Sequence, residues 1–259
     1  MENKISIITP VYNGEKFIAE CIESFIAQNC SQAEHIIVDG ESNDKTVDII
    51  KHYAQKYPHI RWISEKDNGQ SDAMNKGIKM AKGNIVSFLN ADDFYQPNIL
   101  NRALEIFKDL KEPSLVYGNT IIWHEDEWGN YYPSHLWKPK FLNFITMLKN
   151  HKLNQQPPNP SGYFYHKSLH DVIGLYNTKL HYIMDKDFVI KAFVKANTVY
   201  VDETWGNFRY VKNTKTFTNC TALNGVWEEY ERNFDDTMFD RYKKYARLSE
   251  RIFDFLKLK

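Results

Sequence analysis

The chain has 259 residues, of which 42% are hydrophobic and 25% charged, a composition typical of a globular protein with a substantial core. Lysine plus arginine equals aspartate plus glutamate at 33 each, so no overall positive charge indicates a nucleic-acid partner. The three cysteines show no CxxC spacing, which argues against a disulfide scaffold or a zinc site and favours a reducing compartment.

The first residues, MENKISIITPVYN, lack the basic region, the long apolar run and the cleavage site of a signal peptide. No stretch of the sequence approaches the roughly eighteen apolar residues that a membrane-spanning helix needs. We therefore expect a soluble protein of the cytoplasm.

Short apolar runs alternate with amphipathic segments over the first 120 residues. The runs predict strands at 5–9, 35–39, 60–64, 85–89 and 114–118, and the amphipathic segments predict helices at 17–26, 47–54, 73–81 and 97–108. Strands separated by helices indicate βαβ units and a mainly parallel sheet. Ligands of such sheets bind beyond the carboxyl ends of the strands.

The pattern changes after Gly118, where the segment 121–133 predicts a hairpin that turns around Gly129 and Asn130. A Pro-rich connection follows at 154–162. The remaining predicted elements are a strand at 163–166, a helix at 184–196, a strand at 198–203 and one or two helices across 227–252. This second part is expected to complete the first domain rather than to form an independent one.

Polar and acidic loops follow the first four predicted strands, in the segments TPVYNG, VDGESND, SEKDNGQSD and LNADD. A parallel sheet gathers such loops into one crevice. Asp92 and Asp93 are adjacent carboxylates that repel each other unless a positive partner lies nearby. They indicate either the start of the following helix or a site for Mg²⁺ or Mn²⁺, which binds one or two carboxylates together with water and phosphate oxygens.

Motifs of several other enzyme classes are missing from the sequence. It contains no GxxxxGK[ST] and no GxGxxG, which argues against a P-loop enzyme and a Rossmann dehydrogenase. His166 and His170 are four residues apart but lack the glutamate of HExxH, and no GxSxG segment is present.

Four segments, in this order, resemble the family 2 glycosyltransferases of the GT-A fold: ISIITPVYNGEKFIAECIESFIAQ, HIIVDGESNDKT, EKDNGQSDAMNKG and GNIVSFLNADD. The resemblance continues through SLVYGN, GLYNTKLHYIMDKDFVIKAF and FRYVKNTKT, and covers about residues 4–216. It implies an α/β domain at 1–216 with a Rossmann-like, mainly parallel sheet flanked by helices. Residues 1–118 are then expected to form its nucleotide-sugar-binding half and residues 119–216 its acceptor and catalytic half. The resemblance does not extend beyond this domain, and the apolar stripe of the last part predicts a C-terminal helical extension at 217–259.

The resemblance implies a donor site built from the loops after the first four strands. Its members are Pro10, Tyr12 and Asn13 at the base and ribose, Asp39 at the base, Asp67 and Asp72 beside the nucleotide and its sugar, and Asn90, Ala91 and Asp92 in the DxD-type stretch. Asp92 is the implied ligand of Mg²⁺ or Mn²⁺. Asn90 stands where relatives often carry Asp, so the metal site has one charge less than usual.

The resemblance also implies a general base, Asp185 of HYIMDKDF. In inverting transfer this carboxylate takes the proton of the acceptor hydroxyl as that oxygen attacks the anomeric carbon opposite the departing diphosphate. Asp187 is the second choice for the base. The alternative for both residues is that they cap the following helix.

The segment FRYVKNTKT departs from the family pattern, because Val211 replaces a His that helps to hold the metal or diphosphate in relatives. Arg209 and Lys215 are candidates for supplying positive charge to the phosphates. The alternative for these two residues is a solvated place on the surface.

The implied function is transfer of a sugar, with inversion, from a nucleotide-sugar (first of all a UDP-sugar) to a hydroxyl of a saccharide, polysaccharide or lipid-linked saccharide. The rivals are a metal-dependent nucleotidyltransferase, whose Gly-rich basic loop is missing, and a degenerate nucleotide-sugar-binding protein. For the C-terminal apolar stripe, packing on the domain, a homodimer contact and peripheral contact with the inner face of the membrane all stay open.

Overall fold

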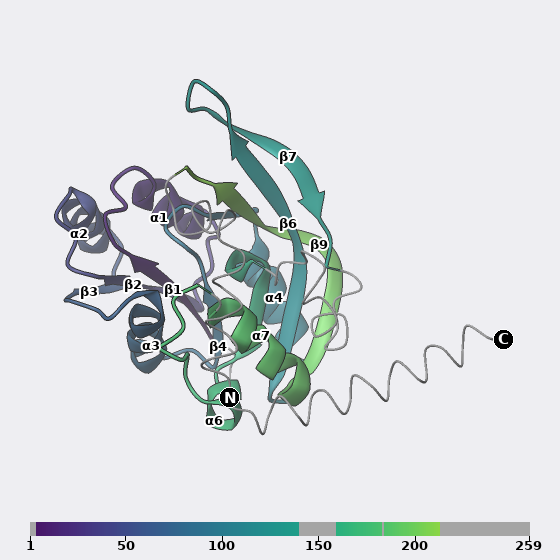
Figure 1. The fold of residues 1–259 in the computed structure, drawn as a ribbon. Coiled ribbons are helices and arrows are strands. Elements are labelled where there is room, and N and C mark those ends of the chain that lie inside the picture. Colours follow the sequence, from purple (N-terminus) through teal and green to yellow (C-terminus); the bar gives the residue numbers. More distant parts are fainter. Residues whose placement is uncertain (1–3, 140–158, 183, 213–259) are drawn as a thin grey trace.

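The computed structural model describes residues 4–139, 159–182 and 184–212 (Figure 1). The predicted C-terminal helices, and with them the membrane and dimer interpretations, lie outside the described residues, as does Lys215. In the described part of the chain, no helix combines the length and the apolar character needed to cross a lipid bilayer.

The first half of the chain follows the predicted alternation of strands and helices. Its elements are β1 (Ile5–Val11), α1 (Ile18–Ile26), β2 (Ala33–Asp39), α2 (Thr46–Lys56), β3 (Ile60–Ser64), α3 (Gln70–Met80) and β4 (Ile85–Phe88). β1 lies between β2 and β4, β3 lies outside β2, and all three pairings are parallel. The predicted βαβ units are therefore confirmed, and the carboxyl ends of four strands meet at one edge.

The rest of the described chain, from Phe94 on, adds both parallel and antiparallel strands to the same sheet. Its elements are β5 (Phe94–Tyr95), α4 (Ile99–Phe107), β6 (Ser114–Glu125), β7 (Tyr131–Trp137), η1 (Pro160–Gly162), β8 (Tyr163–His166), α6 (Leu169–Ile173), α7 (Met184–Lys195) and β9 (Asn197–Tyr210). The strand order is β3-β2-β1-β4-β8-β6-β9-β5, with β7 paired to β6. β8 is antiparallel to β4 and β6, whereas β6 and β9 are parallel.

The predicted hairpin is confirmed as β6 and β7, which project from the body of the sheet (Figure 1). At its turn the Asp126 N–H donates to the Asn130 carbonyl at 2.9 Å, and Gly129 has a φ of 88°, a conformation that favours glycine. The strand predicted at 198–203 is much longer than expected, because β9 runs on to Tyr210.

The core fills both faces of the sheet. Ile7 and Ile8 of β1 are completely buried but belong to different hydrophobic clusters, because neighbouring residues of a strand point to opposite faces. Helices α3 and α7 cover the face of Ile8, while α1 and α4 cover the face of Ile7. At Gly77 of α3 an added Cβ would lie 2.3 Å from Ile8, so only glycine allows this helix to pack so close to β1.

Candidate active site

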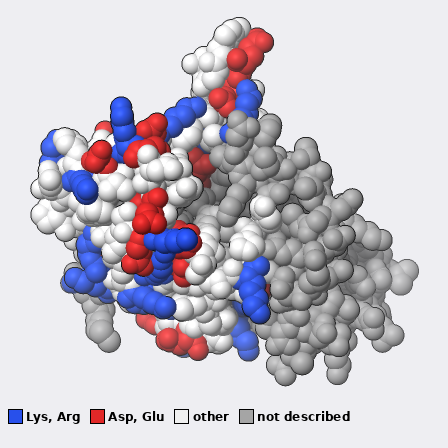
Figure 2. Space-filling view, turned by 60° about the vertical axis from the view of Figure 1, so that its left-hand side comes forward, with Lys and Arg blue, Asp and Glu red and all other residues white. Residues whose placement is uncertain are grey.

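The ten residues predicted for the site come from five places in the chain, and four of these lie at the carboxyl ends of β1 to β4. Among the described residues on the face of the molecule in Figure 2, basic and acidic side chains are interspersed, and these residues form no continuous basic surface. This agrees with the zero net charge and with recognition of a ligand by individual side chains.

Asp39 ends β2 and is completely buried. One of its carboxylate oxygens accepts a hydrogen bond from the Ser42 hydroxyl at 2.5 Å. The other accepts from the Ser42 N–H at 3.0 Å and from the Ser64 hydroxyl at 2.7 Å. A carboxylate has about four acceptor positions, so these three bonds fix the loop after β2 and leave room for one donor from a ligand.

The residues after β1 combine a rigid turn with an exposed ring. Pro10 is buried within β1, whereas Tyr12 is 62% exposed. Asn13 has a φ of 52°, its N–H donates to the Ser42 hydroxyl at 2.8 Å, and its side-chain oxygen accepts from the Asn43 N–H at 3.0 Å. The ring of Tyr12 is thus available for stacking on a planar group, while Asn13 holds the two loops together.

Asp67 lies beside this pair of loops. A Cβ on Gly40 would be 2.5 Å from its Oδ2 and 3.6 Å from the Tyr12 ring, while its Oδ1 accepts from the Gly69 N–H at 2.8 Å. Asp72, in the first turn of α3, accepts from the Asn68 N–H at 3.1 Å. The structure therefore brings Asp67 next to Tyr12 and uses Asp72 to order the loop before α3.

The loop after β4 carries the DxD-type stretch. The Asn90 side-chain oxygen accepts from the Gln70 amide at 3.4 Å, which connects the loop to the start of α3. Ala91 packs on the hydrophobic cluster between α1 and α2. These contacts place Asn90 and Ala91 at the same sheet edge as the loops that carry Asp39 and Asp67.

The two adjacent carboxylates have different surroundings. Asp93 is completely buried, and its oxygens accept from the side chains of Asn90 and Asn159, at 3.1 and 3.3 Å, and from the Arg209 N–H at 3.2 Å. Asp92 is only partly buried. Burial raises the pKa of both carboxyl groups, and the charge of Asp92 raises that of Asp93 further. The expectation that Asp93 starts a helix is wrong, because β5 follows it directly.

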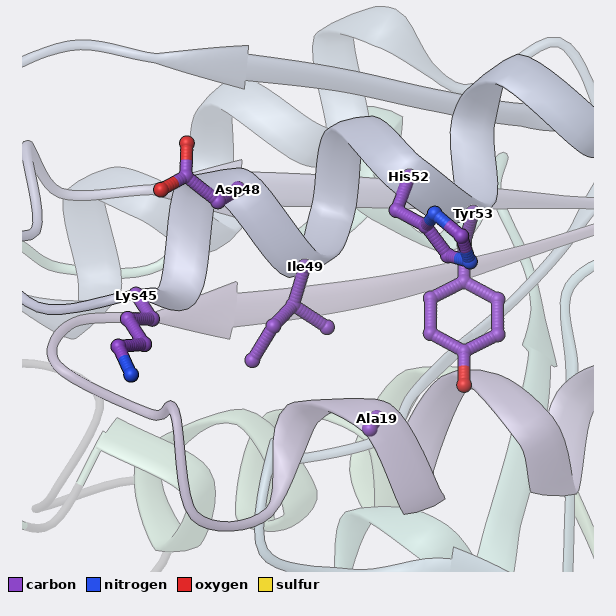
Figure 3. A pocket seen from close by; sticks show the side chains of 6 residues that line it. All are labelled: Ala19, Lys45, Asp48, Ile49, His52 and Tyr53. Carbon is purple, nitrogen blue, oxygen red and sulfur yellow. The ribbon is translucent and has the colours of Figure 1, made fainter.

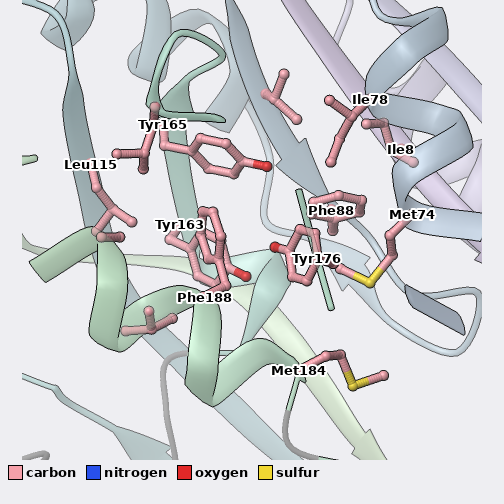
Figure 4. Packing of buried hydrophobic residues seen from close by; sticks show 14 of the residues in the cluster. Ile8, Met74, Ile78, Phe88, Leu115, Tyr163, Tyr165, Tyr176, Met184 and Phe188 are labelled. Carbon is pink, nitrogen blue, oxygen red and sulfur yellow. The ribbon is translucent and has the colours of Figure 1, made fainter. Parts of the chain in front are cut away.

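Asp185 is the second residue of α7, one helical turn before Phe188. The Phe188 ring packs among three buried tyrosines, with centroid distances of 6.0 Å to Tyr163, 4.7 Å to Tyr165 and 5.0 Å to Tyr176 (Figure 4). Burial first, and then the charge of Asp185, raise the pKa of Tyr163. Asp185 therefore lies over a buried cluster of tyrosine side chains.

Asp187 has a different role, because its carboxylate is buried and forms an ion pair of 2.7 Å with Lys191 on the same helix. The carboxylate of Asp187, the second choice for the general base, is thus already bound to a lysine.

The segment before α7 docks on α3. The Ser71 hydroxyl donates to the Leu180 carbonyl at 3.1 Å, and the Asn75 amide donates to the Tyr176 carbonyl at 2.8 Å. The His181 ring lies 3.5 Å from the position of a Cβ on Gly69. Helix α3 thus contacts the segment that precedes α7, while the loop of Asp67 leads into its own first turn.

Sequence reasoning missed two participants in this site, Asn159 and the buried side of Arg209. Arg209 is only 6% exposed, so the alternative of a solvated place on the surface is wrong for this residue. The period of two along a strand could have predicted this burial. Asn207 and Arg209 are two residues apart on β9, so their side chains share one face of the strand, and both are buried. Val211, in the place of the family His, is also buried.

A separate pocket of about 430 Å³ lies between α1 and α2 (Figure 3). Its lining side chains are Ala19, Lys45, Asp48, Ile49, His52 and Tyr53. None of the predicted site residues is among them.

Comparison with known proteins identifies the family. The family model described as "Glycosyl transferase family 2" matches residues 6–171. An uncharacterised glycosyltransferase of Rickettsia typhi is 32% identical over 230 residues, which cover 88% of this chain and 69% of that protein. The PGL/p-HBAD biosynthesis glycosyltransferase of Mycobacterium tuberculosis is 31% identical over 191 residues, covering 73% of this chain and 69% of the relative. The uncharacterised glycosyltransferase YibD of Escherichia coli is 41% identical over 107 residues, or 31% of its length.

Solved structures show the same fold. TarS of S. aureus, in complex with UDP-GlcNAc, matches 94% of this chain and 71% of its own with a TM-score of 0.64 at 18% identity. The mannosyltransferase PcManGT of Pyrobaculum calidifontis, in complex with GDP-Man and Mn²⁺, matches 91% of this chain and 66% of its own with a TM-score of 0.64 at 15% identity. The chain belongs to glycosyltransferase family 2 and has the GT-A fold.

Proposed function

We propose that this chain transfers a sugar from a nucleotide-sugar to a hydroxyl of a saccharide or lipid-linked saccharide, with inversion and with the help of Mg²⁺ or Mn²⁺. One observation carries the proposal: Asp93 is enclosed by three N–H donors, while Asp92 is left partly exposed at the edge where the loops after β1 to β4 meet. The Asp93 carboxylate thus stabilises the loop, and the Asp92 carboxylate can contact a ligand.

The residues present fit a divalent ion that arrives with its substrate. Within the described ranges no group of three or more His, Cys, Asp or Glu side chains could hold a metal alone. Mg²⁺ and Mn²⁺ commonly bind one or two carboxylates and fill their remaining positions with water and phosphate oxygens. Asp92 would hold the ion with Asn90 beside it, and a bound ion stabilises negative charge on a departing diphosphate.

The donor nucleotide is proposed to lie on the loops after β1, β2 and β3. The exposed ring of Tyr12 offers a stacking surface, and Asp39 and Asp67 offer carboxylate acceptors for the base and the ribose. TarS was crystallised with UDP and UDP-GlcNAc, which supports a UDP-sugar as the first donor to test.

Asp185 is proposed as the general base. It lies in the first turn of α7, the segment before this helix docks on α3, and its neighbour Asp187 is already paired with Lys191. Its carboxylate would take the proton of the acceptor hydroxyl during attack on the anomeric carbon. The half at 1–118 would then bind the donor and the half at 119–216 would bind the acceptor.

A thermal-shift screen of nucleotide-sugars, with and without Mn²⁺, tests the proposal first. We expect stabilisation by one or a few donors, larger when Mn²⁺ is present, followed by release of the nucleoside diphosphate on incubation. Donor binding with no release, even over long incubation with saccharide acceptors, would instead identify a binding protein. Release of pyrophosphate from a nucleoside triphosphate would identify a nucleotidyltransferase.

A further inference from the structure

Arg209 of β9 is an arginine buried behind the loop that carries Asp92. Its side chain is 6% exposed although it bears a permanent charge. Burial of a charge is costly unless partners compensate for it, so its contacts indicate a function.

Three polar contacts connect Arg209 to the site. Its backbone N–H donates to the Asp93 carboxylate at 3.2 Å, and its Nη1 donates to the Asp92 carbonyl at 3.0 Å. Its Nη2 forms an ion pair with Glu20 of α1. One residue therefore holds two consecutive residues of the loop and ties them to a helix on the other side.

Three aromatic rings surround the guanidinium. Its Cζ lies 4.5 Å from the ring centroid of Phe94, 5.5 Å from that of Tyr131 and 5.6 Å from that of Phe17. Rings at such distances attract the cation and restrict its movement. They belong to β5, to β7 and to the segment before α1, so the guanidinium lies where the hairpin meets the donor half.

We propose that Arg209 is a positioning residue that fixes the peptide between Asp92 and Asp93, and through it the direction of the Asp92 carboxylate. The inference rests on the proposed function, since it assumes that Asp92 binds the metal. Rotation of that peptide would move the Asp92 side chain, while the Nη1 bond holds the carbonyl oxygen of the peptide and the Arg209 N–H holds the side chain of the next residue, Asp93. This explains how one carboxylate, with Asn90 beside it, keeps a defined direction.

A lysine cannot replace Arg209 in this role. Its ammonium is a single point of charge on a flexible chain, whereas the planar guanidinium donates to the Asp92 carbonyl and to Glu20 at once. Arg209→Lys therefore keeps the positive charge but cannot donate to the Asp92 carbonyl and to Glu20 at the same time.

The test compares Arg209→Lys with Arg102→Lys. Arg102 likewise pairs with a glutamate, donating to both carboxylate oxygens of Glu203, but it is exposed and belongs to α4. Binding of Mn²⁺ in the presence of UDP is measured by electron paramagnetic resonance, and binding of UDP without metal by calorimetry. Donor KM and kcat follow in a transfer assay, and thermal midpoints report folding.

We expect Arg209→Lys to weaken Mn²⁺ binding at least about tenfold, the loss expected for one charged hydrogen bond, and to leave metal-free UDP binding within twofold. Arg102→Lys should change neither. Glu20→Gln, on the half-exposed partner, should weaken Mn²⁺ binding in the same direction but less. This second variant keeps the test decisive if Arg209→Lys does not fold.

Unchanged Mn²⁺ affinity in a folded Arg209→Lys protein, or in Glu20→Gln where the first does not fold, would overturn the inference and leave the proposed function intact. An equal loss of metal-free UDP binding would also overturn it, because it would show that Arg209 contacts the diphosphate itself. Failure of the wild-type protein to bind Mn²⁺ with UDP would overturn both the inference and the metal-assisted part of the proposed function.

Discussion

Gly40 and Asp67 approach each other so closely that any side chain at position 40 would displace the Asp67 carboxylate. A Cβ there would lie 2.5 Å from the Asp67 Oδ2, well inside normal contact distance. The loop after β2 therefore passes directly against the carboxylate that is predicted to lie beside the nucleotide. The backbone of the loop after β2 therefore packs directly against the side chain of the loop after β3.

Gly40→Ala should displace the Asp67 carboxylate by its added methyl group. We expect the donor KM to rise several-fold with little change in kcat, because the base and the metal ligand stay in place. A double-mutant cycle provides the control. In an Asp67→Ala background the methyl group has no carboxylate to displace, so Gly40→Ala should add little. Additive effects in the two backgrounds would show that the contact does not act through Asp67.

The alternation of strands and helices in the first half was predictable because it depends on neighbouring residues. Apolar runs of four to seven residues and amphipathic helices are local patterns, and the loops at the strand ends follow from the parallel pairing. The position of the candidate residues at the ends of β1 to β4 was predictable on the same grounds, whereas their roles are implied only by the resemblance to a family.

The sequence could not predict that Asp93 is buried and hydrogen-bonded while Asp92 stays partly exposed, since this difference depends on residues far away in the chain. Asn159 is 66 residues from Asp93, and Arg209 is 116 residues from it. No local pattern shows that these three will meet. The two-residue strand β5 and the extension of β9 to Tyr210 also depend on distant residues, because β5 pairs with Gly206 and Asn207 and the extension pairs with β6.

Asp92→Ala and Asp93→Ala should therefore have opposite effects. Loss of the partly exposed Asp92 should abolish Mn²⁺-dependent donor binding with little change in stability. Loss of Asp93 should lower the free energy of unfolding by about 3 kcal/mol or more, because three buried N–H donors lose their acceptor. Calorimetric titration with Mn²⁺ and UDP, beside urea unfolding, separates the two effects. If Asp92→Ala retained the metal dependence, Asp92 would not be the ligand.

His35 should make the fold sensitive to mild acid. The ring is completely buried, its Nε2 lies 2.8 Å from the Thr9 hydroxyl, and burial lowers its pKa from about 6.5 to about 3. Below pH 6.5 the unfolded chain binds a proton at His35 that the native state excludes. The stabilisation is thus complete above pH 6.5 and is lost as the pH falls toward 3.

Between pH 7 and pH 5 this single group should lower the free energy of unfolding by about 2 kcal/mol, from 1.36 kcal/mol per pH unit. Urea unfolding of the wild type and of His35→Gln at both pH values measures the difference. His166 and His170 are also buried with lowered pKa values, so part of the pH dependence should remain in the variant. Identical pH dependence in the two proteins would show that His35 is protonated equally in both states.

Asp185→Asn should separate chemistry from binding. The amide has the shape of the carboxylate but cannot take a proton, so kcat should fall by about 10²–10⁴-fold, while the donor dissociation constant stays the same. Asp187→Asn is the matched control two residues away on α7. It breaks the ion pair with Lys191 and should lower the thermal midpoint, but it should change transfer far less. Single-turnover assays with saturating donor distinguish the two, because they report the chemical step without product release. The reverse pattern, with transfer lost in Asp187→Asn and kept in Asp185→Asn, would move the general base to Asp187 and give Asp185 a structural role above the tyrosine cluster.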